Sequence, residues 1–140
     1  MEMEQWRIEL DALLRLLKSA VGEILRRQEG DAFLSWMQSE ALEGFPEVFS
    51  GLDERVARAL ALELGRQIWD ATPLPWNGFR PLPLPHPRGQ DPCPCGSGRS
   101  YEDCCAAAPA VPGLTPRLIG ALMAGLIAEE TWGGAVQEDK

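Results

Sequence analysis

Apolar side chains recur every three or four residues in three stretches of the first half of the chain, which is the spacing of an amphipathic helix. Eight of them fall on one stripe within residues 3 to 28, namely Trp6, Leu10, Leu13, Leu14, Leu17, Val21, Ile24 and Leu25. Most charged residues of this stretch lie outside the stripe. The pattern therefore predicts a long first helix that buries one face.

Two shorter amphipathic stretches follow. Gly30 is expected to end the first helix, and Asp31 is expected to cap a second helix over residues 32 to 43. A capping pattern that begins at Ser50 predicts the start of a third helix. Three amphipathic helices joined by short loops can pack with their stripes facing inward, so we predict a small antiparallel bundle over residues 1–72.

The next stretch is rich in proline. Eight of the twelve prolines lie between Pro73 and Pro94. Each proline lacks a backbone donor and restricts the residue before it to extended geometry, so neither a helix nor a central strand is possible here. We predict a semi-rigid spacer over residues 73–90. Trp76 within it is expected either to hold the spacer against the bundle or to be offered to a partner.

A link and a C-terminal helix are predicted over residues 107–134, and residues 135–140 are expected to be a frayed tail. Thr115 is the expected N-cap, and Pro116 suits the first helical position. The apolar residues of this helix occur in pairs and form a broad stripe that needs a partner surface. That surface is either this chain's own bundle or another molecule.

Charge and hydropathy narrow the functional classes. Asp and Glu number 21 against 13 Lys and Arg, for a net charge of −8, so binding to nucleic acid through its phosphates is not expected. The start of the chain lacks the features of a signal peptide. The longest apolar run, residues 118 to 128, is shorter than the roughly 20 residues that cross a bilayer. We therefore expect a cytoplasmic protein without membrane insertion, in which clustered thiols are metal ligands or redox groups rather than structural disulfides.

All four cysteines fall in one short segment, as Cys93, Cys95, Cys104 and Cys105. Two close pairs of sulfurs separated by a short loop suit tetrahedral Zn²⁺, because each pair can occupy one edge of the tetrahedron. A redox-active or disulfide-linked cluster, an iron–sulfur site and a copper site are the alternatives. Four protein ligands leave no open position on zinc, so hydrolytic zinc chemistry is not expected.

The segment reads Asp-Pro-Cys-Pro-Cys-Gly-Ser-Gly-Arg from Asp91, with Tyr101 and the Cys-Cys pair after it. It resembles the SEC-C motif, the small zinc-binding module at the C-terminus of the preprotein translocase ATPase SecA and in many otherwise unrelated bacterial proteins. The resemblance implies a zinc-binding module over residues 91–106, with the four cysteines as Zn²⁺ ligands and Tyr101 as its small core. Relatives that bind SecB or the ribosome carry lysines near the aromatic residue, whereas Glu102 and Asp103 stand here.

The sequence therefore predicts a mainly α protein that consists of a helical bundle, a proline-rich spacer, a zinc module and a C-terminal helix. Catalysis is not expected, because His86 is the only histidine and lies between two prolines of the spacer. We expect a non-catalytic adaptor that contacts another protein, with the secretion machinery and the ribosome as candidate settings. The alternative is a redox- or metal-responsive regulator that uses the cysteine cluster.

Overall fold

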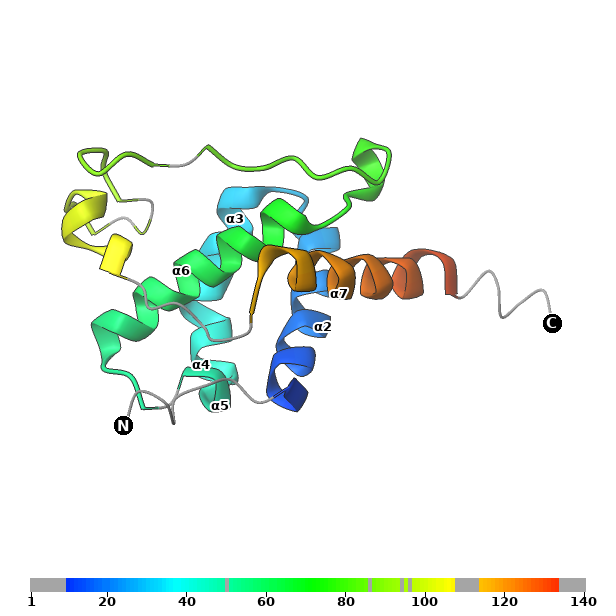
Figure 1. Cartoon of the computed structure of the whole chain (residues 1–140), viewed down its shortest axis with the longest axis horizontal. Helices are drawn as coiled ribbons and strands as arrows, with labels where there is room; N and C mark the ends of the chain where they lie inside the picture. The colour runs from blue at the N-terminus through cyan, green and yellow to red at the C-terminus, as the bar shows by residue number, and fades with distance from the viewer. Residues whose placement is uncertain are drawn as a thin grey trace.

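The computed structural model describes residues 10–49, 51–85, 87–93, 95, 97–107 and 114–133. The fold is mainly α, as predicted, and the described residues contain isolated bridges but no strand. Four helices enclose most of the core (Figure 1), and they are α2 (Leu10–Arg27), α3 (Gly30–Trp36), α6 (Glu54–Ala71) and α7 (Pro116–Ala128). Between α3 and α6 lie a π-helical stretch and two short helices, which are Met37–Ala41, α4 (Leu42–Gly44) and α5 (Pro46–Phe49). No helix among the described residues has the length and apolar character needed to cross a membrane.

The apolar stripe predicted for the first helix is largely confirmed in α2. Leu13, Leu17, Val21 and Ile24 are buried in the core. Leu10 is instead 60% exposed, because it is the first residue of α2 and lies ahead of the turns that pack. The predicted residue Trp6 lies outside the described residues.

The predicted boundary at Gly30 is wrong. Helix α2 ends at Arg27, and Gln28 adopts the left-handed conformation with φ of 57° that usually follows a helix. Gly30 is instead the first residue of α3, where a Cβ atom would lie only 2.6 Å from Cδ2 of Leu84. The glycine therefore makes room for a side chain of the proline-rich segment rather than ending a helix. Asp31 lies in the first turn of α3 and is not its N-cap.

The third predicted helix is present as α6, but it begins later than predicted. Asp53 is its N-cap, and Oδ1 of Asp53 accepts a hydrogen bond of 2.9 Å from the backbone N–H of Val56. A carboxylate at this position also interacts favourably with the positive end of the helix. The predicted start, Ser50, lies outside the described residues.

The C-terminal helix α7 packs against α2 and α6 (Figure 1). Its buried ridge consists of Ile119, Met123 and Ile127. Thr115 caps it as predicted, accepting a hydrogen bond of 3.1 Å from the N–H of Leu118. One side of the broad apolar stripe is therefore covered by this chain's own bundle, the first of the two surfaces that were expected for it.

The proline-rich segment runs outside the helices from the end of α6 to the cysteine segment (Figure 1). Two hydrogen bonds of 2.9 Å attach it to α6: Trp69 Nε1 donates to the carbonyl of Leu82, and the N–H of Leu84 donates to Oδ1 of Asp70. The ring of Trp76 lies 6.4 Å from that of Trp69, centroid to centroid, although Trp76 stays 40% exposed. Trp76 thus contributes to holding this segment against α6.

Candidate metal centre

The structure brings together the four cysteines that the sequence singled out. The four Sγ atoms all lie within 4.8 Å of one another. Sγ of Cys104 lies 3.5 Å from that of Cys95 and 3.8 Å from that of Cys105. A disulfide bond is about 2.05 Å long, and all four cysteines are free thiols.

These sulfurs fit a metal ion at their centre. Zn–S bonds of about 2.3 Å in a tetrahedron separate the sulfurs by roughly 3.8 Å, close to the distances observed from Cys104. Four thiolate donors are the set that zinc prefers at structural sites and also suit other thiophilic ions. The cluster can therefore hold a metal ion through Cys93, Cys95, Cys104 and Cys105.

Backbone pairing places the two cysteine pairs next to each other. The N–H of Cys93 donates a hydrogen bond of 2.9 Å to the carbonyl of Arg99, and Pro92 and Ser100 form an antiparallel bridge. The chain reverses between the two bridged residues through Gly98, whose φ of 87° lies in the left-handed region that glycine tolerates. The turn at this glycine brings Ser100 back beside Pro92, next to the first pair of sulfurs.

A second set of contacts closes the base of the loop. The N–H of Tyr101 donates to the carbonyl of Asp91 at 2.8 Å, and the N–H of Glu102 donates to the carbonyl of Gly89 at 2.9 Å. The carboxylate of Asp91 in turn accepts from the N–H of Arg88 at 2.8 Å. These bonds are local in sequence, which explains why a short segment can hold all four sulfurs.

Burial and hydrogen bonding shift the pKa values of Cys93, Cys95 and Cys105 in different directions. Cys93 and Cys105 are buried, and burial raises the pKa of both thiols. Cys95 is half-buried; burial raises its pKa, but hydrogen bonds with Ser97, Cys93 and Cys104 outweigh it and lower the pKa to about 6. The lowered pKa favours the thiolate of Cys95, which is the form that binds a metal.

The cluster is attached to the helical core. The segment Cys105–Ala107 packs against α6, and the buried side chains of Cys93 and Cys105 belong to the same apolar core as the helices. The Nε2 atom of Gln38 donates to the carbonyl of Arg58 at 2.9 Å and lies 3.8 Å from Sγ of Cys105. Sequence reasoning missed Gln38, because nothing in its local pattern indicates a thiol so distant along the chain.

Tyr101 extends this attachment. It is half-buried against the core, and both burial and the negative charge of Glu63 raise its pKa. A cavity of about 270 Å³ lies between α3, α6 and the proline-rich segment, and Tyr101 contributes to its lining together with Glu63, Arg66, Leu84 and Pro87. Tyr101 therefore lies at the boundary with the bundle rather than only inside its own segment.

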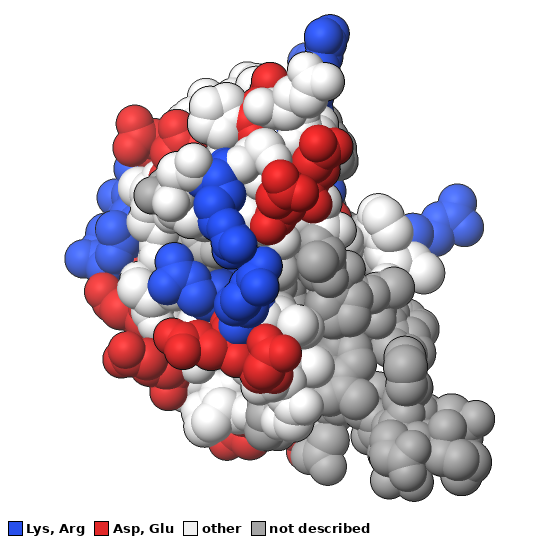
Figure 2. Space-filling view, turned by 90° about the vertical axis from the view of Figure 1, so that its left-hand side faces the viewer, with Lys and Arg blue, Asp and Glu red and all other residues white. Residues whose placement is uncertain are grey.

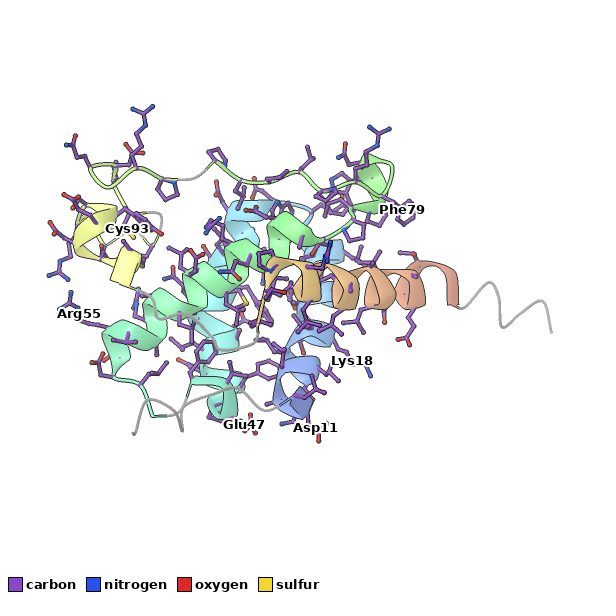
Figure 3. All side chains as sticks on the ribbon, viewed as in Figure 1. Asp11, Lys18, Glu47, Arg55, Phe79 and Cys93 are labelled. Atoms are coloured by element: carbon purple, nitrogen blue, oxygen red, sulfur yellow. The ribbon has the colours of Figure 1, made fainter. Side chains whose placement is uncertain are left out.

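Figure 2 views the end of the molecule where the cysteine segment meets the start of α6. Lys and Arg side chains gather near the centre of this face, with Asp and Glu side chains on either side of them. Arg55 of α6 lies below the segment that carries Cys93 (Figure 3), and Glu102 and Asp103 are exposed. This end of the molecule therefore presents both signs of charge.

Comparison with protein families identifies the segment. Residues 91–107 match the family model of the SEC-C motif. The match includes all four cysteines and Tyr101, so the predicted resemblance is confirmed. Most of the helical fold lies outside the SEC-C motif, and searches of curated proteins and of solved structures found no match to the chain.

Proposed function

We propose that the SEC-C motif of this chain binds one Zn²⁺ through Cys93, Cys95, Cys104 and Cys105. The observation that carries the proposal is the mutual approach of the four sulfurs within 4.8 Å. When bound, zinc supplies four bonds that cross-link a segment too small to fold around its own core, and structural zinc typically contributes about 10 to 16 kcal/mol. Four protein ligands complete the zinc shell, which supports a structural role.

The protein would then act as a non-catalytic adaptor that contacts another protein in the cytoplasm. The zinc would hold the loop of the SEC-C motif in one shape, with exposed side chains such as Arg99, Glu102 and Asp103 available for contact. Fixing a binding loop before it meets a partner lowers the entropy cost of association. The mixed charges at this end of the molecule (Figure 2) favour a partner that carries both signs of charge as well.

Metal analysis combined with affinity capture from a bacterial extract tests the proposal. We expect one zinc per chain, loss of that zinc in Cys95→Ser, and loss of the captured protein in the same variant. Arg99→Glu is the matched variant that changes the surface of the loop without changing its fold, since only the backbone of Arg99 pairs with Cys93. It should keep the zinc but weaken capture. Capture of the same proteins by wild type and Cys95→Ser would contradict the adaptor role.

A second candidate function is redox- or metal-responsive regulation. It is favoured by the position of Cys95 and Cys104, which are both half-buried with their sulfurs 3.5 Å apart. Hydrogen peroxide would oxidise two thiolates to a disulfide, be reduced to water, and release the zinc that those thiolates held.

Exposure of the zinc-loaded protein to mild peroxide decides between the two functions. A regulator should release zinc, measured with a chromogenic chelator, and should change its capture of the partner, with recovery after reduction. A protein that keeps its zinc and its partner under the same treatment is an adaptor. Rebinding of zinc by the peroxide-treated chain after a thiol reductant and fresh zinc are added is the control for zinc loss caused by irreversible damage.

A further inference from the structure

The outward face of α7 is unusual for a helix at a protein surface. From Leu118 to Ala128 no residue has a polar side chain. The exposed residues within this stretch are Leu118, Ala121, Ala124, Gly125 and Ala128. The largest of them, Leu118, is 39% exposed. A helix that is apolar on all sides is normally covered on all sides.

The other long helices of this molecule differ. The exposed face of α2 carries the charged residues Asp11, Arg15 and Lys18. The exposed start of α6 carries Glu54 and Arg55. Since the same fold places charges outward on α2 and α6, the apolar outer face of α7 is a feature of that helix and not of the whole surface.

The sequence of α7 is complementary to itself when reversed about Met123. Ala121 and Gly125 lie two residues on either side of Met123, while Leu118 and Ala128 lie five residues away. In an antiparallel pair related by a two-fold axis at this level, Ala121 of one copy faces Gly125 of the other. The small side chains let the helix axes approach closely, and each Leu118 packs beside a small Ala128.

Charge selects the same orientation. Arg117 precedes the apolar stretch and Glu129 follows it, about 18 Å apart along the helix. An antiparallel pair brings Arg117 of one copy level with Glu129 of the other, and it also opposes the two helix dipoles. A parallel pair would place like charges at each end, which is unfavourable.

We propose that the outer face of α7 is an interface between two copies of this chain. The two helices pair antiparallel, with the two-fold axis at the level of Met123 along the helix. A helix pair of this length buries less than the about 1,200 to 2,000 Å² of a typical stable interface. Association is therefore reversible, with a dissociation constant in the range of about 10 µM to 1 mM.

Sedimentation velocity of the zinc-loaded chain from about 10 µM to 1 mM tests the pair. The mean mass should rise with concentration from 15.4 kDa toward twice that value. Ala121→Glu places a long charged side chain at the centre of the pair and should weaken association more than tenfold. Arg55→Glu, a charge change at an exposed position of α6, should leave association unchanged, and circular dichroism verifies that both variants fold.

Charge reversal tests the orientation. Arg117→Glu and Glu129→Arg should each weaken association about fivefold or more, since two symmetry-related pairs, each contributing up to about 0.5 kcal/mol, are replaced by pairs of like charge. The double variant should restore the wild-type dissociation constant. A mass that does not change with concentration would assign the face to another occupant and overturn the proposal, as would association that Ala121→Glu leaves intact or that the double variant fails to restore.

Discussion

Removal of the zinc proposed for the cysteine cluster should lower the thermal midpoint of this protein by about 10 °C, whereas the helical signal at 25 °C should change little. The SEC-C motif is not an independent appendage, because Cys93 and Cys105 are buried in the same apolar core as the helices. Loss of the metal frees residues 91–107 and uncovers the part of α6 beneath them. A loss of about 3 to 4 kcal/mol corresponds to roughly 10 °C in a chain of this size.

The measurement is a thermal scan by far-UV circular dichroism before and after chelation. Chelator already saturated with zinc is the control for non-specific effects, and added zinc should restore the original midpoint. Cys105→Ser without chelator should reproduce the low midpoint, since it removes a buried ligand. An unchanged midpoint in metal-free protein that still unfolds cooperatively would show that the motif does not stabilise the bundle.

Replacement of Trp69 should be the most damaging single change in the bundle. Its ring lies 6.2 Å from Phe33 and 6.4 Å from Trp76, and Nε1 donates to the carbonyl of Leu82 at 2.9 Å. Trp69→Ala therefore leaves a cavity in the core and releases the proline-rich segment at the same time. We expect a loss of about 3 to 5 kcal/mol in the free energy of unfolding.

Urea titration of the zinc-loaded variants, followed by circular dichroism, measures this loss. Trp69→Phe is the matched control, because it keeps an aromatic ring against Phe33 but cannot donate to Leu82. It should cost much less, on the order of 1 to 2 kcal/mol. Trp69→Ala with the stability of Trp69→Phe would mean that the ring contacts contribute nothing beyond the hydrogen bond.

The parts of this fold that were predictable from sequence depend on neighbours along the chain. The stripe of α2 and the cap at Thr115 follow from helical periodicity and from side chains within one turn. The cysteine cluster was predictable for the same reason, because its four sulfurs are held by hydrogen bonds within residues 88–104.

Gly30 shows where such reasoning fails. A glycine after an amphipathic stretch usually ends a helix, yet here Gln28 takes the left-handed conformation and Gly30 begins α3. A glycine is needed at position 30 for a different reason, since Leu84 of the proline-rich segment leaves no room there for a Cβ atom. Gln38 was missed for a related reason, because its contact with Cys105 depends on how α6 and the SEC-C motif meet.

The sequence by itself determined that this chain is mainly helical, that residues 91–107 are a SEC-C motif, and which four thiols meet. Local hydrogen bonds and helical periodicity are sufficient for each of these. Only the tertiary structure decided that α7 covers the bundle with one face, that Trp69 and Leu84 hold the proline-rich segment, and that two of the four cysteines belong to the main core. These features join residues far apart in sequence, and burial of apolar surface between such residues depends on the whole fold rather than on any local pattern.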